Sequence, residues 1–203
     1  MKSITYLLTV IGIGVGLTAF DFSTPLEIGD VAPMADRMME NVDGTSSSLE
    51  SLKEENGLLV IFSCNTCPYV IAWEEEYPKL AELADDKNIG MVLVNSNKAK
   101  REGDDSMERM KAHYEEAGYT CPYVVDVNAE LANAFGAQTT PHVYLFDSDM
   151  SLVFEGSIND KFENREKEAT QEWLREAMNK LAAGAADEID PADTRQIGCS
   201  IKR

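Results

Sequence analysis

Positive charge is scarce in this chain. Its 203 residues include 18 lysines and arginines against 36 aspartates and glutamates, so the formal net charge is −18. A surface this negative repels the phosphate backbone of nucleic acids and anionic membrane surfaces. We therefore expect no nucleic-acid partner, and we expect most of the acidic side chains only to face solvent.

Histidine is scarcer still, with only His113 and His142. Cys64 and Cys67 form one Cys-x-x-Cys pair, but the chain has no second such pair and no His-x-x-x-His pair. Structural zinc sites combine two pairs of this kind. We expect no metal and no other cofactor. One alternative stays open, in which Cys64, Cys67 and His142 hold a soft ion such as Cu(I) in a metal carrier.

The first residues lack polar character. Lys2 is the only charged residue among the first twenty, and residues 6–20 are almost wholly apolar. A short positive start followed by such a run is typical of a secretory signal, and it is short for a membrane span, which needs about 20 residues. We expect residues 1–22 to direct export to the periplasm or another extracytoplasmic space. The alternative is that residues 4–20 remain as a membrane tether.

The rest of the chain contains no repeat and no second core. Its length suits one globular domain, which we place at residues 23–184, followed by a C-terminal tail at residues 185–203. Apolar runs of strand length alternate with segments of helical spacing, which predicts a parallel strand–helix–strand unit. A hairpin and a final helix follow. The expected strands span residues 58–63, 89–95, 122–127, 143–146 and 151–155, and the expected helices span residues 49–55, 70–83 with a kink at Pro78, 106–117, 128–135 and 169–183. The expected architecture is α/β, with a central mixed sheet flanked by helices on both faces.

The Cys-x-x-Cys pair lies at the junction of a buried strand and a helix. Cys64-Asn65-Thr66-Cys67-Pro68 follows directly on the apolar run at residues 58–62. A thiol at a helix N-terminus is close to unpaired N–H groups and to the positive end of the helix dipole, which favour the reactive thiolate. The spacing also allows the second sulfur to close a disulfide with the first. The motif therefore indicates redox chemistry.

A second motif relates the chain to a known family. The dithiol motif is followed roughly seventy residues later by Thr140-Pro141, and this combination resembles the thioredoxin superfamily. The opening at residues 29–33 and the ending Gly198-Cys199-Ser200 are similar to its redoxin branch, within a Cys-x-x-Cys-containing peroxiredoxin-like group. The resemblance implies the thioredoxin fold and a cis Pro141 that lies against the dithiol. It also implies that the Thr140 backbone binds an extended substrate.

The same resemblance implies a thiol–disulfide oxidoreductase. Cys64 would attack a substrate disulfide, and Cys67, expected to be the more buried thiol, would then release the reduced substrate. The implied partners are protein thiols or disulfides and an electron donor that the sequence does not identify. Trp73 is expected to pack near the site, and His142 is a candidate for raising the thiolate fraction, although a partly exposed strand histidine is the simpler interpretation.

The alternative enzyme is a thiol-dependent peroxidase with an antioxidant role. Peroxiredoxins carry a Thr-x-x-Cys-Pro-like element, and Cys67-Pro68 corresponds to its reactive cysteine. This chain has Cys64 where that threonine stands. Peroxide would then oxidise Cys67, and Cys64 would resolve it.

Two cysteines remain, Cys121 and Cys199. Each is a candidate structural or resolving thiol. Three arrangements stay open: both are free and buried, the tail folds back to pair Cys199 with Cys121, or the tail brings Cys199 to the Cys-x-x-Cys pair.

Overall fold

The computed structural model describes residues 24–163, 168–190 and 196–203. These ranges fold around a seven-stranded sheet with the order β2-β1-β5-β4-β3-β7-β8. The three central strands β3, β4 and β5 are parallel, whereas β7 runs antiparallel to β3, β8 to β7 and β1 to β5. The strands are β1 Met39–Asn41, β2 Ser46–Ser47, β3 Leu58–Ser63, β4 Gly90–Asn95, β5 Tyr123–Val125, β7 His142–Phe146 and β8 Leu152–Gly156. The predicted α/β architecture with a mixed central sheet is confirmed.

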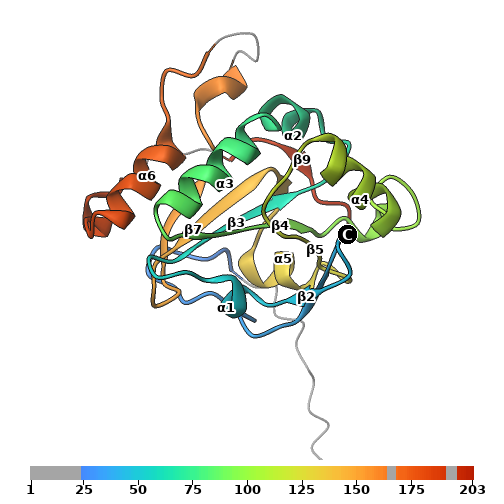
Figure 1. The fold of residues 1–203 in the computed structure, drawn as a ribbon, viewed down its shortest axis with the longest axis horizontal. Helices are drawn as coiled ribbons and strands as arrows, with labels where there is room; N and C mark the ends of the chain where they lie inside the picture. Colours follow the sequence, from blue (N-terminus) through green and yellow to red (C-terminus); the bar gives the residue numbers. More distant parts are fainter. Residues whose placement is uncertain (1–23, 164–167, 191–195) are drawn as a thin grey trace, which may run out of the picture.

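Helices cover both faces of this sheet. In Figure 1, α2, α3, α4 and α6 lie above the sheet, and α1 and α5 lie below it. The bounds are α1 Leu49–Leu52, α2 Pro68–Trp73, α3 Glu76–Asp86, α4 Met107–Glu116, α5 Glu130–Phe135 and α6 Trp173–Ala182, with short 3-10 turns at Lys98–Lys100, Asp160–Glu163 and Ala186–Glu188.

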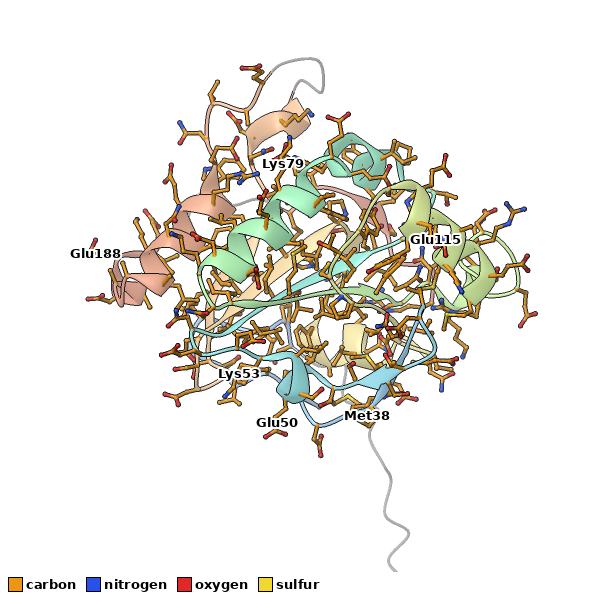
Figure 2. All side chains as sticks on the ribbon, viewed as in Figure 1. Met38, Glu50, Lys53, Lys79, Glu115 and Glu188 are labelled. Atoms are coloured by element: carbon orange, nitrogen blue, oxygen red, sulfur yellow. The ribbon has the colours of Figure 1, made fainter. Side chains whose placement is uncertain are left out.

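Strand β3 separates two apolar cores. Leu59 and Ile61 face the core under α2, α3, α4 and α6, whereas Val60 and Phe62 face the core over α1 and α5. All six residues of β3 are buried, so a continuous apolar run is what such a strand requires. The charged residues labelled in Figure 2, among them Glu50, Lys79 and Glu115, lie at the outside.

The expected kinked helix is two helices. Helix α2 ends at Trp73 and α3 begins at Glu76, so the break precedes Pro78 instead of occurring at it. Proline has no N–H to bond the carbonyl four residues earlier, and its ring clashes with that carbonyl. Both problems disappear when Pro78 lies in the first turn of a new helix.

A second, small sheet joins the C-terminus to the domain. Strand β6 (Thr139–Thr140) pairs antiparallel with β9 (Cys199–Ser200), with Thr140 opposite Cys199. Ile201 is buried in the lower core, and its N–H donates to the Gln138 carbonyl at 2.9 Å. The end of the predicted tail is therefore packed against the domain.

Within the described ranges, no helix has the length and apolar character needed to cross a membrane. The segment expected to direct export, residues 1–22, lies outside the described residues.

Candidate active site

Cys64 and Cys67 lie between β3 and α2. Cys67 is the N-cap residue of α2, and Pro68 occupies the first helical position, where a missing N–H costs nothing. The dithiol is thus at the strand–helix junction that the sequence predicts. The two residues are 3% and 4% exposed, so the expectation that Cys67 is the more buried thiol is wrong. Asn65 between them is buried as well, whereas Thr66 is exposed.

Thr140 contacts both sulfurs. The Thr140–Pro141 peptide bond is cis, as expected. The Cys64 Sγ lies 3.2 Å from the Thr140 hydroxyl, and the Cys67 Sγ lies 3.1 Å from the Thr140 carbonyl oxygen. The two motifs, far apart in the sequence, therefore form one site.

The two thiols ionise as a coupled pair. A hydrogen bond from Cys64 lowers the pKa of Cys67 to about 4, against the effect of burial, with smaller contributions from Cys199 and the Val70 N–H. The same hydrogen bond, and then burial, raises the pKa of Cys64 above its ordinary value. One sulfur is thus charged at neutral pH and the other keeps its proton.

The contacts with Thr140 act in the opposite direction. A carbonyl oxygen only accepts, so the Thr140 carbonyl favours a proton on Cys67, whereas the Thr140 hydroxyl can donate to Cys64. The lowered first pKa therefore belongs to the pair, with the remaining proton shared between the two sulfurs.

A buried carboxylate adjoins the dithiol. Asp105 is fully buried and accepts hydrogen bonds from the Asn65 N–H at 2.9 Å, from Asn95 Nδ2 at 2.8 Å and from Asn97 Nδ2 at 2.9 Å. Its charge is a further, smaller cause of the raised pKa of Cys64. In the sequence, Asp105 lies between the strand expected at residues 89–95 and the helix expected at residues 106–117, with nothing to mark it as a site residue. The signal in the sequence that could have pointed to a buried partner was the two asparagines, Asn95 and Asn97, at and just after the carboxyl end of β4.

Asn65, between the two cysteines, forms hydrogen bonds through its backbone N–H and through both polar groups of its side chain. Besides the bond to Asp105, its Nδ2 donates to the Asp104 carbonyl at 2.7 Å, and its Oδ1 accepts from the Tyr123 hydroxyl at 3.0 Å. Asn95 donates in turn to that hydroxyl at 3.0 Å. These bonds fix the backbone of the Cys-x-x-Cys loop.

His142 does not reach the sulfurs. It is buried in β7, where one ring nitrogen lies 2.8 Å from Glu155 Oε1 and the other lies 3.2 Å from the Tyr144 hydroxyl. Its predicted influence on the thiolate and its predicted partial exposure are both wrong, because both nitrogens have partners on β7 and β8. Among the described residues, no group of three or more His, Cys, Asp and Glu side chains is arranged to hold a metal ion.

Trp73 belongs to the same apolar core as the two cysteines. It is almost fully buried, and its indole N–H donates to Asn159 Oδ1 at 2.6 Å. It supports the site from within the core.

The remaining cysteines lie in different places. Cys121 lines a hollow together with Gly90 and Met91, at the start of β4, and burial raises its pKa to about 12. Cys199 lies in β9, beside Cys67. These two places are at opposite ends of the parallel strands. Of the three arrangements left open, the Cys121–Cys199 pairing is therefore wrong, and the tail instead brings Cys199 to the dithiol.

Several solved structures are similar to this chain. A protein of unassigned function from Geobacillus kaustophilus is 36% identical, with a TM-score of 0.79 over 87% of this chain and 92% of that chain. A hypothetical protein from Sinorhizobium meliloti is 29% identical, with a TM-score of 0.80 over 89% and 96%. A mutant of PrxQ from Xylella fastidiosa is 19% identical, with a TM-score of 0.57 over 80% and 99%, which shows a common fold.

No curated protein matches the chain. The family model described as Redoxin matches residues 27–171, which is most of the folded domain and includes Cys64, Cys67 and Thr140. Solved thioredoxin-like structures share the fold. The chain therefore belongs to the redoxin family and has the thioredoxin fold.

Proposed function

We propose that this protein is an exported thiol–disulfide oxidoreductase that works through the Cys64–Cys67 pair. The observation that carries the proposal is the contact of both sulfurs with Thr140, next to the cis Pro141. Membership of the redoxin family supports thiol-based redox chemistry in general. Export rests on the apolar N-terminal segment alone.

The reaction proceeds by two exchanges. The Cys64 thiolate attacks one sulfur of a substrate disulfide, and the other substrate sulfur leaves as a thiolate and takes a proton. Cys67 then attacks Cys64, which releases the second substrate thiol and leaves a Cys64–Cys67 disulfide. The substrate is reduced by two electrons, and the dithiol is oxidised by two.

The residues around the pair support each step. The Thr140 hydroxyl can donate to a charged Cys64, and the proton shared with Cys67 keeps one sulfur ionised at neutral pH. The edge of β6 beside the sulfurs pairs with β9 in an antiparallel manner, and an extended peptide that carries a disulfide would pair there in the place of β9.

A second candidate is a thiol peroxidase that uses Cys67. The lowered pKa of Cys67 and its position at the N-terminus of α2 favour it, because a peroxidatic cysteine reacts as a thiolate. Peroxide would oxidise Cys67 to a sulfenic acid, and Cys64 would condense with it to a disulfide and water.

Two assays on three variants separate these functions. One follows the reduction of a model protein disulfide, and the other follows hydrogen peroxide consumption with added thiol. The oxidoreductase predicts that Cys64→Ser abolishes disulfide reduction. Peroxide turnover that survives Cys64→Ser but not Cys67→Ser would contradict the oxidoreductase and support the peroxidase. Cys121→Ser is the control, since this thiol lies at the start of β4, and it should leave both rates unchanged.

A further inference from the structure

The edge of β6 beside the dithiol is already occupied. Strand β9 pairs antiparallel with Thr139 and Thr140, as an extended peptide docked on that edge would. Cys199 lies directly opposite Thr140, and Thr140 is the residue that contacts both reactive sulfurs. The register therefore presents a thiol to the dithiol.

The contact between Cys199 and the dithiol is direct. Cys199 packs against the core cluster that contains Cys64 and Cys67, and Cys67 and Cys199 each shift the other's pKa. Cys199 is less buried than either member of the Cys-x-x-Cys pair, which are almost excluded from solvent. It is thus the thiol of the three that an external reductant or oxidant reaches most easily.

The chain around Cys199 is fitted to this position. Gly198 packs so closely on β6 that a Cβ at this residue would lie 2.2 Å from the Thr140 carbonyl oxygen. On the other side, the Lys202 N–H donates to Asn97 Oδ1 at 2.8 Å, and the Lys202 carbonyl accepts from the Ala99 N–H at 2.8 Å. With Ile201 buried in the core, the tail is anchored on both sides of the thiol.

We propose that Cys199 is a third redox thiol, held by β9 as a built-in substrate strand, and that it exchanges disulfides with Cys67. The proposal rests on the proposed function, because it uses the Cys64–Cys67 disulfide that the reaction forms. Cys199, as its thiolate, attacks the Cys67 sulfur. The Cys67–Cys199 bond forms, the Cys64–Cys67 bond breaks, and Cys64 leaves as a thiolate that takes the proton lost by Cys199. No electron leaves the protein.

The state of the dithiol sets when this exchange runs. Burial and then the neighbouring Cys67 raise the pKa of Cys199 to about 11 in the reduced protein. In the oxidised pair no proton or charge remains on Cys67, so that second cause disappears and the thiolate of Cys199 becomes easier to form. The exchange moves the disulfide from an almost closed site to the less buried tail. An external substrate that docks on β6 must displace the same strand.

The test traps the new disulfide in the full chain. In Cys64→Ser, oxidised glutathione should modify Cys199 or Cys67 and release one glutathione. The other of these two thiols should then displace the second glutathione and leave a Cys67–Cys199 disulfide, seen as a linked peptide after digestion without reductant and mass spectrometry. A chain that keeps glutathione on Cys67 while Cys199 remains open to alkylation would overturn the proposal. Cys64→Ser/Cys199→Ser is the control that must keep the glutathione.

A backbone variant tests the docking itself. Gly198→Ala pushes β9 off the Thr140 carbonyl. In the Cys64→Ser background the linkage should therefore form at least about tenfold more slowly, as expected when the hydrogen bonds of a two-residue pairing are lost. Ser200→Ala, at an exposed position of the same strand, should form the linkage at the parental rate. Equal rates for Gly198→Ala and Ser200→Ala would overturn the role of β9.

The two proposals fail separately. Reduction of model disulfides by the wild-type chain, without a Cys67–Cys199 linkage in the trap, would remove the third thiol and leave the oxidoreductase. A linkage in a chain whose wild type reduces no disulfide would remove the oxidoreductase and leave the exchange chemistry of Cys199.

Discussion

Asp105→Asn is the most informative single substitution outside the cysteines. The Asp105 carboxylate is fully buried and accepts three hydrogen bonds, one from the backbone of Asn65 within the Cys-x-x-Cys loop. An asparagine has nearly the same shape but only one acceptor oxygen. Its amide nitrogen must then face a side-chain amide donor, either that of Asn95 or that of Asn97.

The magnitude follows from these contacts. Hydrogen bonds to a charged group contribute roughly 1.5–3 kcal/mol each, and at least one is lost while the others become neutral. Arg101, whose guanidinium donates to the Asp105 carbonyl at 2.7 Å, also loses a nearby negative charge. We expect the free energy of unfolding to fall by about 3–5 kcal/mol, out of the total of about 5–15 kcal/mol that is usual for a domain.

Urea denaturation measures this loss. With a slope of about 2 kcal/mol/M, the midpoint should fall by about 1.5–2.5 M. Asp104→Asn is the matched control, because its carboxylate is 55% exposed and pairs with Lys100 at 3.3 Å, so it should change stability by less than about 1 kcal/mol. An Asp105→Asn loss no larger than that of Asp104→Asn would refute the argument.

The same variant has a chemical readout. Because the charge of Asp105 helps to raise the pKa of Cys64, it opposes a thiolate at the dithiol, and its removal should lower the first pKa of the pair. The direction is checked by the thiolate absorbance during pH titration under conditions where the variant is folded. An upward shift would show that the carboxylate stabilises the thiolate, contrary to its position in the structure.

Three further predictions concern the surroundings of the dithiol. The pKa of Cys67 is lowered to about 4 and the thiolate is the reactive form, so the alkylation rate of the pair should be nearly constant from about pH 6 to 8 and should fall as the pH approaches 4. The alkylation rate of an ordinary thiol would rise about tenfold per pH unit between about pH 6 and 8. Mass spectrometry of the alkylated peptide measures the rate, and an ordinary profile would contradict the shared proton. Trp73→Phe removes the hydrogen bond to Asn159 and should cost about 2–3 kcal/mol in thermal or urea unfolding, and an unchanged stability would show that this buried contact contributes nothing. Tyr123→Phe leaves the Asn65 Oδ1 without its donor and should both destabilise the protein by about 1–3 kcal/mol and slow disulfide reduction; a loss of stability without a change in rate would limit Asn65 to a structural role.

The sequence predicts those parts of the fold that depend on long runs of one kind. Strand β3 is found at the predicted residues, Leu58–Ser63, because a strand buried on both faces must be apolar throughout. Helix α4 is capped by Ser106, whose hydroxyl accepts from the Arg109 N–H, and α5 ends at Gly136 with a φ of 68°, where glycine meets little steric penalty. Local chemistry of this kind is visible without tertiary structure.

The parts that were not predicted depend on contacts between distant segments. Strands β6 and β9 have two residues each, which is too short for any periodicity, and their pairing joins Thr139–Thr140 to Cys199–Ser200. Asp105 looks like any loop aspartate until Asn65 and Asn95 are placed beside it. His142 was misjudged for the same reason, since only the hairpin of β7 and β8 brings Glu155 to its ring.

Charge balance explains how so acidic a chain can hold a thiolate next to a buried carboxylate. Two negative groups at one site would oppose each other, and the charge of Asp105 does raise the pKa of Cys64. Arg101 offsets this, because its guanidinium is half-buried and donates to the carbonyls of Asn95 and Asp105 at 2.8 and 2.7 Å. Burial lowers the pKa of Arg101, but an arginine stays protonated at neutral pH. The positive charge is therefore held by the main-chain oxygens of Asn95 and Asp105. Among the described residues, both sulfurs hydrogen-bond with Thr140 and not with a cation, so the thiol pair shares one proton without such a contact.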